Sequence, residues 1–197
     1  MGHSGTAPVE LAASAARSAT RASSRLEDEV VALYDQLRAP VFRYLLSFRL
    51  SVPDAEEVIQ EVFLALFRHL QQGKSRANLQ GWIFRVAHNS ALKCRMRARR
   101  DADRFSHMPD LSATLAHTEP GPEEILAGRQ RQERLLAVVH ALPEQDQFCL
   151  SLRAEGLRYR DIAQVLGISL GSVAASLHKS LSRLIRAEET DGGWHAF

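Results

Sequence analysis

Cysteine is scarce in this 197-residue chain, since Cys94 and Cys149 are the only two and no CxxC spacing occurs. A disulfide framework or a zinc site is therefore not expected, and the composition fits a reducing cytoplasm. Apolar runs of membrane-spanning length are absent, so no membrane partner is expected. Sustained alternation of apolar and polar residues is absent as well, which argues against β-strands. Abundant alanine, leucine and arginine instead predict an all-α protein.

Signatures of catalysis and cofactor binding are missing too. The eight histidines are scattered, and no pair has a metal-binding helical spacing with supporting carboxylates. The sequence contains no glycine-rich phosphate loop and no nucleophile elbow. Glu56 and Glu57 are adjacent, so they point to different faces of a helix and make a poor acid/base pair. We therefore expect a protein without enzyme activity, bound metal or cofactor.

The segment from Tyr159 to Arg186 has the pattern of two helices joined by a tight turn. Gly167 interrupts the apolar spacing of the first helix, and Ser169 is placed to cap the second. The second helix is predicted to bury Val173, Leu177, Leu181 and Leu184. This pattern is typical of a DNA-binding helix-turn-helix, whose second helix lies in the major groove. A plain helical hairpin in an all-helical core is the alternative.

An acidic amphipathic helix is predicted from Asp54 to about Leu70. Ser51 is its expected cap and Pro53 lies in its first turn. Acids near the start of a helix suit its positive N-terminal end, which explains them without any partner. The other interpretation is a polar face that docks on a basic partner, and the helix alone favours the simpler explanation. The residues of this face are Asp54, Glu57, Gln60 and Glu61.

Acidic residues are absent between Arg76 and Arg100, where seven basic residues occur. A helix is predicted to begin near Asn78, with an apolar front half around Trp82 that packs in a core. Its back half has no apolar face and is expected to project as a positive rod. Because solvated charged faces normally mix signs, a rod of one sign indicates contact with nucleic-acid phosphates. The candidate contacts are His88, Asn89, Lys93, Arg95, Arg97, Arg99 and Arg100.

Composition divides the chain into two small helical domains with a linker and two ends. Residues 1–24 hold one acid and too little apolar surface to order themselves, which predicts a disordered tail. The first domain covers residues 25–100, and its first helix is expected to kink or break at Pro40. Residues 101–122 are rich in proline and predict a flexible linker. The second domain covers residues 123–188, and residues 189–197 form a C-terminal tail.

Three blocks in order, DAEEVIQEVFLALFRHL, GWIFRVAHNSALKCRMRARR and YRDIAQVLGISLGSV, resemble the ECF group of bacterial RNA polymerase sigma factors. The resemblance covers residues 26–188. It implies that the acidic helix binds core RNA polymerase and that the basic helix recognises and opens the −10 promoter element. It also implies that the helix-turn-helix reads the −35 element. The implied partners are core RNA polymerase and promoter DNA, and an anti-sigma factor is left open.

The predicted recognition helix departs from the family pattern. The family often has Thr-Val-Lys-Ser-Arg after its glycine, whereas Gly171 is followed here by Ser-Val-Ala-Ala-Ser. Two usual basic contacts are therefore missing, which is expected to flatten the salt dependence of DNA binding by about two units of slope. Arg158 and Arg160 are predicted to supply phosphate contacts instead. The candidate −35 contacts are Arg158, Arg160, Ser169, Gly171, Ser172, Ala175, Ser176, Lys179 and Arg183.

Two other functions remain open. One is an ordinary DNA-binding regulator whose first domain senses a signal or dimerises. The basic rod from Lys93 to Arg100 argues against it, because a sensor domain does not need such a rod whereas a promoter-melting domain does. The other is a sigma-like interaction protein that binds polymerase or an anti-sigma protein without initiating transcription. The shortage of cations in the recognition helix keeps that alternative open.

Overall fold

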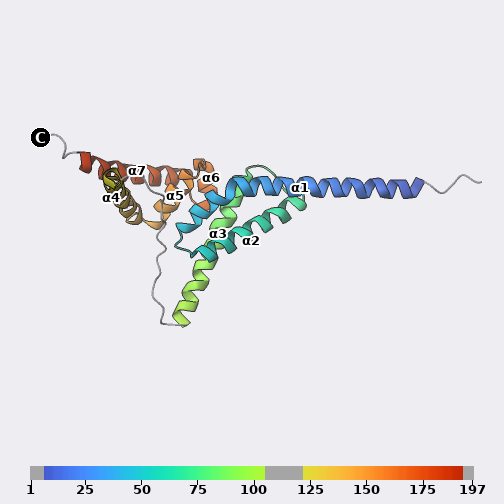
Figure 1. Ribbon diagram of the computed structural model, residues 1–197, viewed down its shortest axis with the longest axis horizontal. Helices are drawn as coiled ribbons and strands as arrows, with labels where there is room; N and C mark the ends of the chain where they lie inside the picture. The colour runs from blue at the N-terminus through green and yellow to red at the C-terminus, as the bar shows by residue number, and fades with distance from the viewer. Residues whose placement is uncertain (1–6, 105–121, 193–197) are drawn as a thin grey trace, which may run out of the picture.

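The computed structural model describes residues 7–104 and 122–192, and all the regular structure in these ranges is helical (Figure 1). The helices are α1 (Ala7–Leu46), α2 (Val52–Gln71), α3 (Leu79–Arg104), α4 (Pro122–His140), α5 (Glu144–Ala154), α6 (Tyr159–Leu166) and α7 (Leu170–Gly192). The all-α prediction is confirmed. Most of the predicted linker and the last five residues of the predicted C-terminal tail lie outside the described residues. None of the helices described is long and apolar enough to cross a membrane.

Helix α1 differs from the prediction in two ways. It begins at Ala7, inside the segment predicted to be a disordered tail, and it continues through Pro40 without interruption. Its first half extends away from the other helices (Figure 1), so burial in the core does not account for it. This stretch is rich in alanine and arginine, which have high intrinsic helix propensity, and the prediction considered burial alone.

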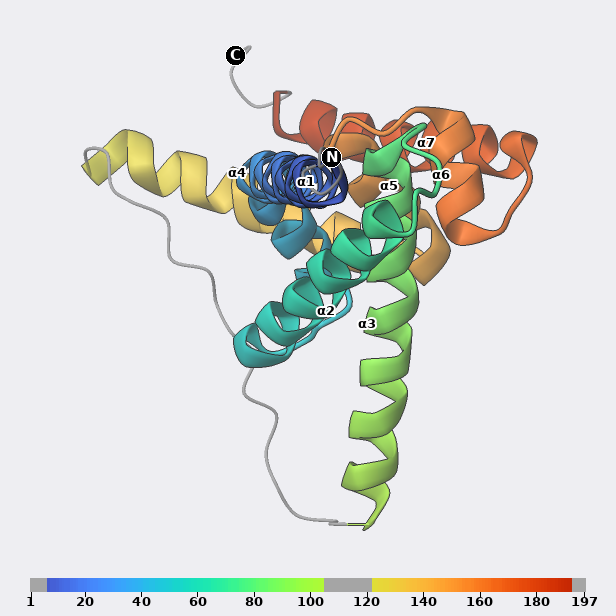
Figure 2. The same cartoon turned by 90° about the vertical axis from the view of Figure 1, so that its right-hand side faces the viewer.

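The second half of α1 packs with α2 and the first half of α3. Ser51 caps α2 as predicted, since the backbone N–H of Asp54 donates to Ser51 Oγ at 3.2 Å. Apolar residues at helical spacing from all three helices are fully buried, among them Val41, Ile59 and Ile83. Beyond Ala91 the buried face of α3 ends, and its second half projects below the other helices in Figure 2.

Helices α4 to α7 form the second group. Gly167 ends α6 with a left-handed φ of 67°, which allows the sharp turn into α7. Ser169 caps α7, because the backbone N–H of Ser172 donates to Ser169 Oγ at 3.0 Å. Val173 is buried as predicted, whereas Leu181 is 48% exposed and not part of the core. The helix-turn-helix geometry that the sequence predicts is therefore present.

The two groups of helices are not separate in this structure. Helices α5 and α6 pack against α1 and α3, and one apolar core runs through both groups. Phe148 of α5 lies at this junction and stacks on Phe48, with ring centroids 4.4 Å apart. The sequence predicts domains joined by a flexible linker, and contacts between them were not foreseen.

Candidate nucleic-acid interface

The second half of α3 presents most of the predicted −10 contacts to solvent. The exposed members are Asn89, Lys93, Arg97, Arg99 and Arg100. All of these except Asn89 belong to the second half of α3, which projects from the body of the protein (Figure 2). Phosphates of a nucleic acid can reach this surface without any rearrangement. The structure thus supports a projecting basic rod, while its contacts with DNA remain predictions.

His88 does not belong to this exposed surface, which corrects its assignment as a DNA-facing residue in this arrangement. Its side chain is only 7% exposed. Its Nδ1 lies 2.7 Å from the hydroxyl oxygen of Tyr44, and its ring meets Phe148 edge-on at 5.4 Å. Burial lowers the pKa of His88 from 6.5 to about 4, and the nearby Arg95 guanidinium adds to the effect. The imidazole is therefore neutral at physiological pH.

Arg95 is also engaged by the second group of helices. Its guanidinium forms a two-pronged ion pair with Glu144 at the start of α5, with Nη2 and Oε2 3.1 Å apart. The same guanidinium lies 5.9 Å from the centre of the Phe48 ring. Hydrogen bonding to Arg95 lowers the pKa of Glu144. Only 22% of the Arg95 side chain is exposed, so it too is unavailable to DNA in this arrangement.

The acidic face of α2 lies beside α3. Glu57, Gln60 and Glu61 are exposed, and Asp54 is half-buried and accepts a hydrogen bond from the Ser51 hydroxyl at 2.6 Å. Burial raises the pKa of the Cys94 thiol in α3, and the carboxylates of Asp54 and Glu57 raise it further. An exposed acidic surface therefore adjoins the helix that carries the basic rod. Asp54, Glu57 and Glu61 are three and four residues apart, which places their carboxylates on one face of α2.

The exposed face of the helix-turn-helix contains all but one of the predicted −35 contacts. The exposed members are Arg158, Arg160, Ser169, Gly171, Ser172, Ala175, Lys179 and Arg183. Ser176 is wrong as a contact, because it is 5% exposed and its hydroxyl donates to Asp146 of α5 at 2.5 Å. Ser180 is fully buried and donates to the carbonyl of Ser176 at 2.8 Å. These two serines are buried beside Val173 and Leu177, which are buried as predicted, whereas Leu184 is only half-buried and Leu181 is exposed.

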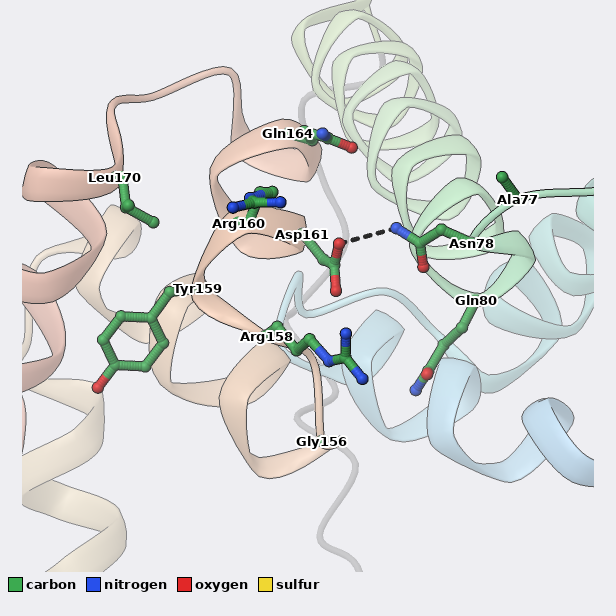
Figure 3. Close-up of a pocket in the computed structure, with 10 residues that line it drawn as sticks. All are labelled: Ala77, Asn78, Gln80, Gly156, Arg158, Tyr159, Arg160, Asp161, Gln164 and Leu170. Carbon is green, nitrogen blue, oxygen red and sulfur yellow. Dashed lines mark hydrogen bonds between the residues drawn. The ribbon is translucent and has the colours of Figure 1, made fainter. Parts of the chain in front are cut away.

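A hollow of about 1100 Å³ is lined by residues of the helix-turn-helix and by residues at the start of α3 (Figure 3). Arg158, Arg160 and Gln80 line it. At its edge the side-chain amide of Asn78 donates to Asp161 at 2.8 Å and so links the two helical groups. The two arginines predicted to contact phosphate are thus both exposed and border an open, polar space.

Sequence reasoning missed the residues that join the two groups of helices. These residues are Phe148, Tyr44, Glu144 and Glu155, and the sequence analysis singled out none of them. Each of these residues has a partner far away in the chain. Glu155, for example, forms a two-pronged ion pair with Arg43 at 2.6 and 2.9 Å. No periodicity within one helix reveals such pairs. The described residues contain no cluster of three or more side chains suited to a metal ion.

Comparison with known families matches both groups of helices. Residues 33–104 match the family described as sigma-70 region 2, and residues 132–184 match sigma-70, region 4. The chain is 31% identical over 144 residues to the ECF RNA polymerase sigma factor SigE of Mycolicibacterium smegmatis, covering 72% of this chain and 55% of that protein. It is 26% identical over 155 residues to RNA polymerase sigma factor YlaC of Bacillus subtilis, covering 78% of this chain and 88% of that protein.

Two solved structures share the fold. One is CnrH in complex with the cytosolic domain of CnrY, with a TM-score of 0.56 and 20% identity over 88% of this chain and 96% of that one. The other is the sigma factor RpoE in complex with the anti-sigma factor NepR from Bartonella quintana, with a TM-score of 0.58 and 17% identity over 81% and 98%. At these identities the likeness concerns the fold alone.

Region 2, which contains the basic helix α3, is followed by region 4, which contains the helix-turn-helix. This order defines a sigma factor of the sigma-70 type. Within that class the chain belongs to the ECF group of RNA polymerase sigma factors.

The buried His88 makes stability depend on pH. Because its pKa in the folded protein is about 4, below the ordinary 6.5, the neutral ring stabilises the fold above pH 6.5. This contribution to the free energy of unfolding, about 3 kcal/mol, is lost as the pH falls from 6.5 through about 4. Urea unfolding should show the decline in the wild-type protein and a flatter profile in H88Q. The exposed His140 serves as control, so H140Q should keep the wild-type slope. Equal pH profiles for wild type and H88Q would contradict the assignment.

Ala174 is exposed on α7 at a position where the family often has a lysine. The A174K variant should therefore bind duplex DNA more tightly, with its logarithmic salt dependence steeper by about 0.9 because one phosphate contact is gained. Fluorescence anisotropy with a mixed-sequence duplex measures both quantities. A141K adds the same charge at an exposed turn outside the motif and controls for net charge. If the two variants gain the same slope, Ala174 does not face DNA.

Proposed function

We propose that this chain is a non-catalytic, cytoplasmic subunit that binds core RNA polymerase and directs it to promoters. One observation supports this most directly: the second half of α3, in which residues 93–100 carry cations and no acid, projects from the body of a molecule that also has an exposed helix-turn-helix. A rod of this kind suits phosphates of an opened promoter, while a helix-turn-helix suits duplex DNA. A regulator that only binds an operator needs the second element and not the first.

In this proposal α2 provides the contact with core polymerase. Glu57, Gln60 and Glu61 form an exposed polar face, with Asp54 at its edge. Charge complementarity with a basic partner surface would speed association and fix the orientation of docking. Glu56 lies on another side of α2, where it pairs with Arg38 at 2.6 Å.

The two DNA-binding surfaces divide the promoter between them. Asn89 and Lys93 lie closest to the body on the exposed part of α3 and are proposed to meet the −10 bases, while Arg97, Arg99 and Arg100 hold phosphates. The −35 element is proposed to lie against α7, with Arg158 and Arg160 on the flanking backbone. Because α7 offers few cations, −35 binding depends on the other contacts of the complex.

An anti-sigma factor is proposed as a further partner. The structure of RpoE from Bartonella quintana is a complex with the anti-sigma factor NepR, and this chain has the same fold. The fold likeness supports the class of partner without identifying the protein.

Transcription tests the function directly. Purified core polymerase, supplied with this chain and genomic DNA fragments, should give start sites that core polymerase alone does not give. The R97Q/R99Q variant should lose most of this activity, because two phosphate contacts on the rod are removed. R85Q removes a charge from the exposed side of the same helix before the rod and should stay active. Polymerase binding without new start sites would favour the sigma-like interaction protein instead.

The acidic face has its own test. E57Q/E61Q should weaken binding to core polymerase by about tenfold, as expected for the loss of roughly 1.4 kcal/mol at a charged interface. E56Q, on the same helix but paired with Arg38, should bind like wild type. Surface plasmon resonance with immobilised core polymerase measures both. Unchanged affinity of the double variant would show that the acids serve only the helix N-terminus.

A further inference from the structure

One large apolar side chain lies exposed on the basic half of α3. Met96 is 54% exposed, in the part of the helix that projects from the body (Figure 2). Its neighbours in the chain, Arg95 and Arg97, are both cations, and no acid lies between Lys93 and Arg100. A rod that only held phosphates would need charge, and an exposed methionine adds none. The place of Met96 therefore needs a separate explanation.

Packing inside the protein does not explain Met96. The face of α3 that enters the core ends at Ala91, which is fully buried, and Met96 lies more than a helical turn beyond it. Leu92 and Cys94, the apolar residues that follow Ala91, are partly buried and pack against the core. Met96 is exposed instead, so a substitution at this position leaves the core intact.

Helical spacing places Met96 on the same face as two of the proposed −10 contacts. Asn89, Lys93, Met96 and Arg100 follow one another at intervals of four, three and four residues, and all of them are exposed. Residues at these intervals form one stripe along a helix. Met96 lies about 10 Å beyond Asn89 along the axis, which is about three base steps of DNA. A nucleic acid that follows the stripe therefore meets Asn89 and Lys93 first, then Met96, then Arg100.

The chemical character of the stripe changes at Met96. On the side of the body, Asn89 and Lys93 offer hydrogen-bond donors that suit base edges, whereas the cations from Arg97 to Arg100 suit phosphates. Between them, methionine offers a flexible apolar side chain whose sulfur makes favourable contacts with aromatic rings. Apolar side chains, methionine among them, act as wedges between stacked bases in other proteins that bind DNA.

The surrounding charge decides what kind of partner can cover Met96. Lys93, Arg97 and Arg100 are exposed around it, so an apolar protein surface would have to desolvate these cations to reach the thioether. A nucleic acid meets no such obstacle, because its phosphates neutralise the cations while the face of a base covers the methionine. The occupant that fits this position is an unstacked base.

We propose that Met96 is a wedge at the junction between duplex and opened DNA, where it contacts the face of the first unpaired base and keeps that base from restacking. The proposal rests on the proposed function, because it takes the exposed stripe of α3 as the surface that meets the opened −10 element. It assigns Met96 a role that no predicted contact has. The cations bind paired and unpaired strands alike, whereas Met96 favours the unstacked state.

Fluorescence of 2-aminopurine, which rises when this base leaves the stack, measures the effect. The probe is a mixed-sequence duplex with a single-stranded end, and 2-aminopurine is its first unpaired base. It is titrated to saturation with the full-length chain bound to core polymerase, so that differences in affinity do not affect the final signal. Wild type should give a clear rise in fluorescence. A second probe, with the label deep inside the duplex, should give none.

Three substitutions separate an apolar wedge from other roles of Met96. M96L keeps the apolar bulk and should give the wild-type rise. M96A should lower the population of unstacked bases about tenfold, because most of the apolar contact is lost. M96K adds a cation, so it should bind the probe at least as tightly as wild type and still lose the rise. V31A removes a similarly exposed apolar side chain from α1 and should behave like wild type.

A wild-type rise in M96A or M96K at saturation would overturn the proposal, and so would loss of the rise in M96L. The same titration with the free chain separates this proposal from the proposed function. If core polymerase is not bound, the proposed function fails and the variants are compared on the free chain. If wild type gives no rise in either form, there is no wedge. New start sites together with a normal rise in M96A would support the proposed function and refute the wedge.

Discussion

The Phe148 ring packs where the two groups of helices meet, within the apolar core that they share. It stacks on Phe48, meets His88 edge-on and lies 6.3 Å from Tyr44, so α5 is held against both α1 and α3. This packing requires a neutral imidazole, because a charged ring would be desolvated there. The Tyr44 hydroxyl satisfies His88 Nδ1 and leaves no buried polar atom without a partner among the described side chains. An aromatic cluster with one polar pair thus holds α5 against the first group of helices.

Charge is distributed so that the exposed surfaces differ in sign. The acids of α2 lie on one face and the cations of α3 on the rod that follows it, close enough for both to affect Cys94. Neither surface is neutralised by the other in this structure, since Glu57 and Arg97 both remain exposed. Opposite signs on neighbouring helices allow two partners of opposite charge to bind side by side, as a protein surface and a nucleic acid do.

Local signals in the sequence predicted the caps of α2 and α7 and the turn between α6 and α7 correctly, because each depends on residues a few positions apart. Ser51, Ser169 and Gly167 do in the structure what their spacing indicates. The buried side of α7 was predicted less well. Apolar spacing chose Leu181, yet the core takes Ser176 and Ser180, whose hydroxyls bond to Asp146 and to the helix backbone. Which side of a helix is buried depends on the helix packed against it, and Asp146 is 30 residues away in the chain.

The same limit explains why His88 and Arg95 looked like simple DNA contacts. Their partners, Tyr44, Phe148 and Glu144, lie on other helices, and only the assembled fold brings them together. This changes the meaning of the cation-poor recognition helix. A protein whose −10 surface is partly covered and whose −35 helix has few cations gains little by binding DNA alone. Tethering to polymerase would supply the missing affinity through effective concentration. Weak DNA contacts of this kind would make promoter binding depend on the polymerase.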